Sequence, residues 1–154
     1  MQESIIIKPS VEKLFEHFMR QGRVLFFSAP CGFGKTAVAE ALLSSREALR
    51  LPVDSVGSKL PSAEADWQIL LLDDLQDMQE EQDWNALCEL IRACPERRFV
   101  LLSRGAPPGC LMAFQYTGLM TVLEADDLLF DADDVRRLLR LYGVEAADSE
   151  IDGI

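Results

Sequence analysis

The sequence predicts an α/β fold in which a mostly parallel sheet carries helices on both faces. Two observations support this class. Three short, continuously apolar runs, residues 24–27, 69–72 and 99–102, have the length and content of strands that are buried on both faces. Between them lie stretches whose apolar residues recur at helical spacing. Alternation of such strands and helices is typical of a three-layer α/β domain.

The composition is that of one globular domain covering residues 1–154. Of the 154 residues, 49% are hydrophobic and 27% are charged, which suits a sizeable core. No apolar run is long enough to cross a bilayer, and the start lacks the basic segment of a signal peptide, so we expect no membrane partner and a cytoplasmic location. The formal net charge of −11 argues against direct nucleic-acid contact by this chain, because such contact requires a basic surface.

In the first half of the chain, each expected element has a local signal. Ser10 is expected to cap a helix that ends at Gly22, and the strand of residues 24–28 follows it. A second helix is predicted over residues 35–45, and a weaker strand over residues 49–53, where Pro52 interrupts the pattern. Residues 54–67, rich in serine with Gly57 and Pro61, are expected to form a loop.

The second half continues the alternation. Residues 69–73 predict a buried strand, and Asp83 is expected to cap a helix that Pro95 stops. A third buried strand covers residues 99–103, and a turn-rich stretch of glycine and proline over residues 105–109 precedes a short strand at residues 120–123. The last predicted element is a helix that Asp131 caps and Gly143 ends.

A glycine-rich segment joins the strand of residues 24–28 to the helix that follows. It matches the P-loop pattern, with alanine where the first glycine usually stands, and consists of Ala29, Pro30, Cys31, Gly32, Phe33, Gly34, Lys35 and Thr36. Glycine lets successive backbone N–H groups converge on phosphate oxygens, and the helix start adds unpaired amides and a positive dipole end. Lys35 is therefore expected to reach the β- and γ-phosphates of ATP or ADP, and Thr36 to hold Mg²⁺.

Two carboxylates follow the strand of residues 69–72 at its carboxyl end, where open α/β sheets bind their ligands. The run resembles a Walker B motif, so Asp73 is the candidate second holder of Mg²⁺. Asp74 is the candidate that orients or activates a water. Because aspartate is one methylene shorter than the glutamate common in fast ATPases, we expect slow hydrolysis or none.

Arg104 follows the strand of residues 99–103, which in a parallel sheet ends at the same edge as the P-loop. Arginine is always charged and offers several donors to phosphate oxygens, so Arg104 is the candidate contact for the γ-phosphate. The cysteines, in contrast, lack zinc-ligand spacing, and we expect Cys31, Cys88, Cys94 and Cys110 to be reduced thiols.

Together these sequence motifs resemble the nucleotide-binding domain of STAND-class P-loop ATPases, specifically that of large bacterial LuxR-family transcription activators of the maltose-activator type. Over residues 5–142 the matching pieces include the P-loop, residues 70–74, the strand ending in Ser103 and Arg104 with prolines after it, and residues 123–130. The resemblance implies a three-layer P-loop NTPase fold that switches between ADP and ATP. It also implies an N-terminal fragment whose partners are the remaining domains of the same polypeptide, with nucleotide-dependent self-association of the full-length protein.

Two other functions stay open at this point. A small P-loop kinase is one, because the same fold supports phosphoryl transfer to metabolites. However, residues 54–67 contain no arginine of the kind a kinase lid uses. A P-loop-derived interaction scaffold without nucleotide turnover is the other, and intact Lys35, Thr36 and Asp73 argue against it.

Overall fold

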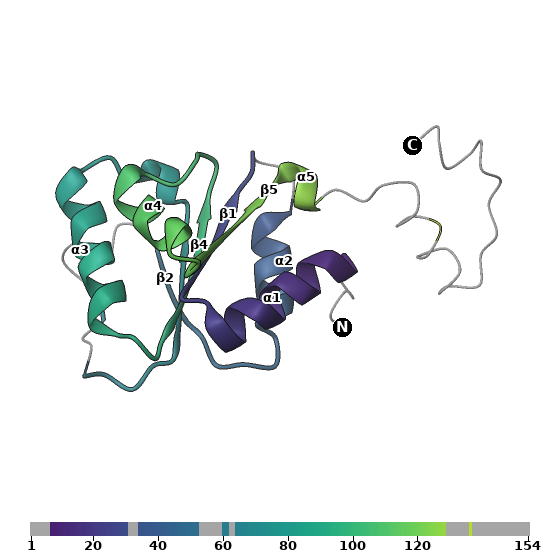
Figure 1. The fold of residues 1–154 in the computed structure, drawn as a ribbon, viewed down its shortest axis with the longest axis horizontal. Helices are drawn as coiled ribbons and strands as arrows, with labels where there is room; N and C mark the ends of the chain where they lie inside the picture. The colour runs from purple at the N-terminus through teal and green to yellow at the C-terminus, as the bar shows by residue number, and fades with distance from the viewer. Residues whose placement is uncertain (1–6, 31–33, 53–59, 62–63, 129–135, 137–154) are drawn as a thin grey trace.

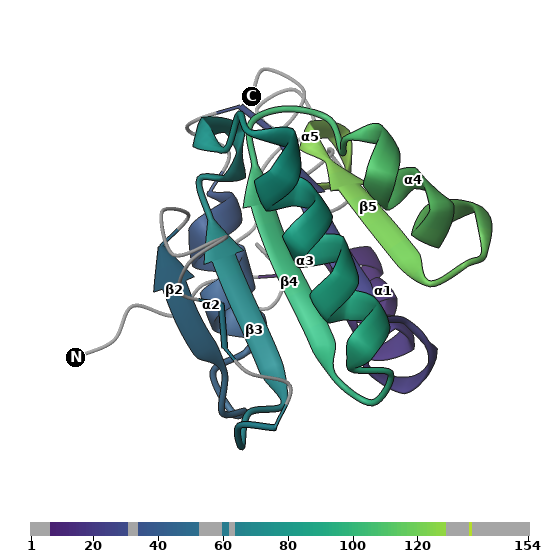
Figure 2. The same cartoon turned by 90° about the vertical axis from the view of Figure 1, so that its left-hand side faces the viewer.

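The computed structural model describes residues 7–30, 34–52, 60–61, 64–128 and 136. Its centre is a five-stranded sheet with the order β2-β3-β4-β1-β5, and each neighbouring pair is parallel. Figure 2 shows β2, β3, β4 and β5 in this order across the sheet. The strands are β1 (Val24–Ser28), β2 (Leu49–Pro52), β3 (Ile69–Asp73), β4 (Arg98–Ser103) and β5 (Met120–Glu124). The predicted strands are thus confirmed, and the sheet is parallel throughout the described residues.

Helices cover both faces of the sheet. In Figure 1, α3 (Glu81–Ala93) and α4 (Gly109–Tyr116) lie on one side of it, and α1 (Pro9–Gln21) and α2 (Lys35–Leu42) lie on the other. A short helix, α5 (Ala125–Leu128), follows β5 directly. The three-layer arrangement predicted from the alternating pattern is confirmed. No helix within the described ranges is long and apolar enough to cross a membrane.

Successive strand residues face opposite helical layers, which explains why the strands are continuously apolar. Phe26 of β1 belongs to the apolar layer under α3 and α4, whereas its neighbour Phe27 belongs to the layer under α1 and α2. Both side chains are fully buried. Leu72 and Leu71 of β3 divide between the two layers in the same way.

Two predicted helix starts were wrong by two or three residues. Lys8, not Ser10, is the N-cap of α1, because Pro9 needs no N–H partner at the first helical position. Glu80 is the N-cap of α3, and Asp83 lies in its first turn. At the other end of a helix, α2 ends at Leu42, three residues before the predicted Ser45.

One helix was not predicted, and one lies outside the described residues. α4 begins at Gly109 directly after Pro108, inside the stretch whose glycines and prolines indicated only turns. Leu111 and Phe114, three residues apart, are its buried face. The helix that we expected Asp131 to cap falls outside the described residues.

Two arginines at the amino edge of the sheet hold the carboxyl ends of two helices. Arg98 donates hydrogen bonds to the carbonyls of Phe18 and Met19 at the end of α1, at 3.3 and 2.8 Å. Arg23 donates to the carbonyls of Ile91 and Cys94 at the end of α3. Burial, and then the nearby charge of Arg98, lowers the pKa of Arg23 below its usual value. These contacts attach the carboxyl ends of α1 and α3 to the amino edge of the sheet.

Candidate functional site

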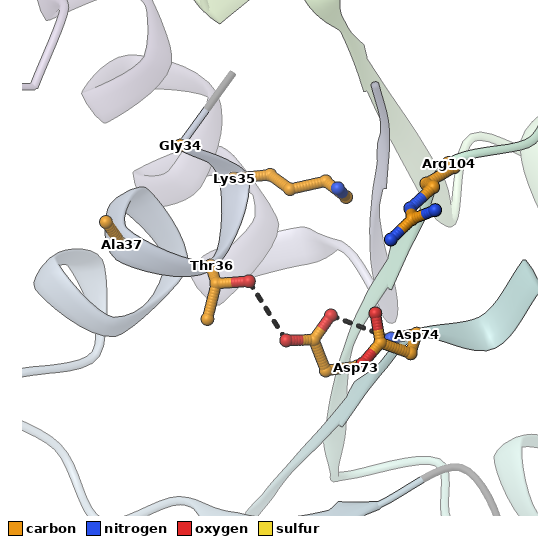
Figure 3. Close-up of a pocket in the computed structure, with 7 residues that line it drawn as sticks. All are labelled: Gly34, Lys35, Thr36, Ala37, Asp73, Asp74 and Arg104. Atoms are coloured by element: carbon orange, nitrogen blue, oxygen red, sulfur yellow. Dashed lines mark hydrogen bonds between the residues drawn. The ribbon is translucent and has the colours of Figure 1, made fainter. Parts of the chain in front are cut away.

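The strand order brings three distant chain segments together at the carboxyl edge of the sheet. β4 lies between β1 and β3, so the loops after β1, β3 and β4 leave the sheet side by side. A pocket of about 420 Å³ lies at this edge (Figure 3). It is lined by Gly34, Lys35, Thr36, Ala37, Asp73, Asp74 and Arg104.

Gly34 turns the chain into α2 and leaves the first amides of the helix without helical partners. Its φ is +70°, in the left-handed region that glycine enters without strain. The first hydrogen bond of the helix runs from the Val38 N–H to the Gly34 carbonyl, at 2.9 Å. The amides of residues 35–37 therefore precede it, as the early amides of every α-helix do. This geometry suits an anion at the helix start.

Lys35 is a buried cation that faces the pocket. Only 8% of the surface of Lys35 is exposed to solvent. The side chain extends from α2 toward Arg104, which comes from the opposite side of the pocket (Figure 3). A partly desolvated ammonium group favours a nearby anion, because burial without compensation is costly.

Thr36 and Asp73 place oxygen atoms at the floor of the pocket. The Thr36 hydroxyl donates to Oδ2 of Asp73 at 2.9 Å, although the two residues are 37 positions apart. The other carboxylate oxygen, Oδ1, accepts the backbone N–H of Asp74 at 2.7 Å. Mg²⁺ prefers oxygen ligands such as hydroxyl and carboxylate groups. The Thr36 hydroxyl can act as such a ligand because its oxygen keeps its lone pairs while its hydrogen is shared with Asp73. The residues therefore fit this ion.

Asp74 holds an uncommon backbone conformation. Within the described part of the chain it is the one non-glycine residue in the left-handed region, with φ 59° and ψ 37°. Its carbonyl accepts the N–H of Asp77 at 3.0 Å, which closes the 3₁₀ turn η2 (Leu75–Asp77). Aspartate tolerates this region better than most residues do, and such conformations concentrate at functional sites. The result is an exposed carboxylate beside the pocket.

Arg104 stands where β4 leaves the sheet, and nearby contacts tie that position to the end of β1. The Ala29 N–H donates to the Ser103 carbonyl at 3.1 Å, and the Ser28 hydroxyl donates to the Gly105 carbonyl at 3.0 Å. Arg104 itself is exposed, and its guanidinium group points into the pocket (Figure 3). The site thus has one cation on each side, Lys35 and Arg104.

The structure brings together six of the residues proposed from the sequence, namely Gly34, Lys35, Thr36, Asp73, Asp74 and Arg104. Ala29 and Pro30 end the strand side of the loop and do not line the pocket. Cys31, Gly32 and Phe33 lie outside the described residues, so their roles stay predictions.

Two residues of the site were not predicted from the sequence. Ala37 lines the pocket in the first turn of α2 and has no side-chain chemistry that a motif could reveal. Gln76 connects two site residues by hydrogen bonds to Asp74 and Arg104. The available signal was its position two residues after a carboxylate at a strand end, which is too common to be informative.

The remaining cysteines are not among the residues that line the pocket. Cys88 and Cys94 are buried, Cys110 is half-buried, and all three are free thiols. Burial, followed by a hydrogen bond with Cys110, raises the pKa of Cys88 to about 12. At neutral pH the Cys88 thiol is therefore protonated and a poor nucleophile.

No protein-family model and no curated protein matches the sequence. Solved structures do match. A DNA replication initiation factor shares 16% identity at a TM-score of 0.54, with 94% of this chain and 53% of that chain covered. A Walker-type ATPase of Pyrococcus abyssi shares 12% identity at a TM-score of 0.57, with 96% and 62% covered.

A third similar structure is a Signal Transduction ATPase with Numerous Domains, or STAND protein, of Pyrococcus horikoshii, which carries a tetratricopeptide repeat sensor. It shares 10% identity at a TM-score of 0.58, with 97% of this chain and 28% of that chain covered. The chain thus spans less than two thirds of each of these three proteins. Their common fold, with its parallel sheet and helices on both faces, shows that this chain has the fold of P-loop ATPases.

Proposed function

We propose that the chain binds Mg-ATP and Mg-ADP in the pocket at the carboxyl edge of its sheet. The observation that carries this proposal is the buried side chain of Lys35, which faces the pocket beside the start of α2. The triphosphate supplies the negative charge that a partly desolvated ammonium group favours. The amides at the helix start favour the same anion.

The other residues divide the ligand between them. Lys35 contacts the β- and γ-phosphates, and Arg104, on the facing side, contacts the γ-phosphate alone. Thr36 and Asp73, which are joined by a hydrogen bond, hold Mg²⁺, and Asp73 acts through water because the ion keeps much of its hydration shell. When bound, this ion neutralises phosphate charge. Asp74 orients a water, and its short side chain favours slow hydrolysis.

We further propose that the domain is a regulatory switch of a bacterial LuxR-type transcriptional regulator. The sequence motifs that resemble those of such regulators support this role, and the fold shared with a STAND protein is compatible with it. An arginine that contacts only the third phosphate gives the two nucleotide states different contacts, as a switch requires. In this proposal, the remaining domains of the same polypeptide respond to that difference, and the full-length protein self-associates when ATP is bound.

Thermal unfolding tests nucleotide binding directly. At a hundredfold excess of Mg-ATP over its dissociation constant, ligand linkage predicts stabilisation of about 2.7 kcal/mol. For a chain of this size that corresponds to a rise in melting temperature of roughly 5–10 °C. We expect the rise at micromolar to millimolar Mg-ATP, and a similar one with Mg-ADP. An unchanged melting temperature would favour the scaffold, whereas rapid phosphate release by the monomer would favour an enzyme.

The two neighbouring aspartates are expected to separate in their effects on binding. Asp73→Asn should reduce the Mg²⁺ dependence of nucleotide binding, because a neutral amide is a weaker partner for the hydrated ion. Asp74→Asn should preserve binding and lower only the turnover. The measurement is the affinity of each variant for ATP in Mg²⁺ and in a chelator. The same Mg²⁺ dependence in both variants would contradict the assigned roles.

A further inference from the structure

Gln76 of η2 connects two residues of the site through the two ends of its side-chain amide. Its Nε2 donates to Oδ1 of Asp74 at 3.2 Å, and its Oε1 accepts the backbone N–H of Arg104 at 3.0 Å. We call this pair of contacts the amide bridge. Gln76 is half-buried, whereas its two partners, Asp74 and Arg104, are exposed residues of the pocket.

The amide bridge spans the two strand ends where the sheet itself no longer joins them. The register between β3 and β4 runs from Ile69 paired with Arg98 to Leu72 paired with Leu101. Asp74 and Arg104 both lie beyond these last paired residues. The bridge is therefore a direct link between the two segments at the level of the pocket.

We propose that Gln76 is a positioning residue that fixes Arg104 relative to Asp74 and thereby sets the preference of the site for a third phosphate. The inference rests on the proposed nucleotide function. The diphosphate part of either nucleotide lies against the start of α2 and Lys35. Only a γ-phosphate extends to Arg104. The Arg104 backbone N–H is bound to Gln76, and its side chain points into the pocket. Loss of the bridge therefore affects ATP and spares ADP.

The amide is suited to this role because it donates at one end and accepts at the other. Methionine has a similar length but cannot make either hydrogen bond. Glutamate keeps an acceptor for the Arg104 N–H, but it places a second carboxylate beside Asp74, where like charges repel. Exchange of donor and acceptor in the pair, with Gln76→Glu and Asp74→Asn together, recreates a hydrogen bond between the two side chains.

The first experiment compares Gln76→Met with the unchanged 154-residue chain. Titration calorimetry gives the dissociation constants of Mg-ADP and of a Mg-bound non-hydrolysable ATP analogue. We expect unchanged ADP affinity and analogue affinity lower by about threefold to tenfold, as loss of the hydrogen bond to the Arg104 N–H implies. Gln79→Met, at an exposed glutamine three residues away, is the matched control and should leave the ratio of the two affinities unchanged.

The second experiment tests the chemistry of the amide bridge. Gln76→Glu should lower the analogue-to-ADP affinity ratio, and the double variant Gln76→Glu, Asp74→Asn should restore it toward that of Asp74→Asn alone. In amide NMR spectra, Gln76→Met should shift the Arg104 amide proton upfield. The Gly105 amide, which donates to the Ser103 hydroxyl at 3.1 Å, should not move.

The outcomes distinguish this inference from the function on which it rests. If the unchanged chain binds neither nucleotide, the proposed function fails and the inference fails with it. If the chain binds both and Gln76→Met keeps the affinity ratio, Gln76 does not position Arg104 while the proposed function stands. Equal loss of ADP and analogue binding in Gln76→Met would also overturn the inference, because it would indicate a general structural role.

Discussion

Replacement of Lys35 by alanine is expected to weaken Mg-ATP binding at least about tenfold, which is about 1.4 kcal/mol or more. The side chain is buried at the pocket, so its ammonium group acts where solvent screening is weaker than at the surface. Without it, the triphosphate keeps uncompensated charge against the start of α2. Titration calorimetry of both chains measures the difference.

Lys13→Ala is the matched control for this variant, because Lys13 is an exposed lysine on α1, away from the pocket. It should leave the affinity unchanged, which separates a local role of Lys35 from the effect of net charge. Equal affinities of the Lys35→Ala variant and the unchanged chain would reject the pocket as the phosphate site. Both variants should show similar melting temperatures without nucleotide.

Replacement of Phe26 by alanine is expected to destabilise the fold by about 3–5 kcal/mol, the range for large aromatic residues in a packed core. Phe26 is fully buried on β1, within the layer under α3 and α4. The smaller side chain loses transfer free energy and leaves a cavity between sheet and helices. Urea unfolding should show a lower midpoint with little change in the slope.

Tyr116→Ala provides the aromatic control, since Tyr116 is 82% exposed at the end of α4. Its effect on the free energy of unfolding should stay within about 0.5 kcal/mol, as for most surface substitutions. Similar losses in the two variants would contradict the burial that separates them.

The fold class could be predicted because the strands carry a strong local signal. A strand buried on both faces must be apolar at every position, and residues 24–27, 69–72 and 99–102 are. The order β2-β3-β4-β1-β5 was not predicted, because the apolar run of β1 contains nothing that selects β4 and β5 as its neighbours.

The misses in secondary structure also have physical causes. α4 follows two prolines and starts at a glycine, so the turn signals of Pro107, Pro108 and Gly109 masked a helix that tertiary contacts of Leu111 and Phe114 stabilise. At α1 and α3, Ser10 and Asp83 have side chains typical of caps, yet neither N-cap in the structure makes a side-chain capping bond. At α1 the proline at the first helical position accounts for the earlier start.

For the site, the sequence predicted the residues whose chemistry follows a local pattern. Each of these residues lies at a strand end or a helix start, where sequence motifs are recognisable. All of them line one pocket, namely Lys35, Thr36, Asp73 and Arg104. Gln76 could not be found in this way, because its partners are Asp74, two residues earlier, and the backbone of Arg104, which only the insertion of β4 beside β3 brings near.

The position of β1 inside the sheet also has a consequence for biosynthesis. Both of its neighbours come later in the chain, since Val24 pairs with Phe99 on one side and with Met120 on the other. A ribosome, which builds the chain from its amino end, therefore releases the apolar residues of β1 long before their partners exist. Until β4 emerges, the nascent chain carries an unpaired strand that is prone to aggregation, and chaperone contact with residues 24–28 would protect it.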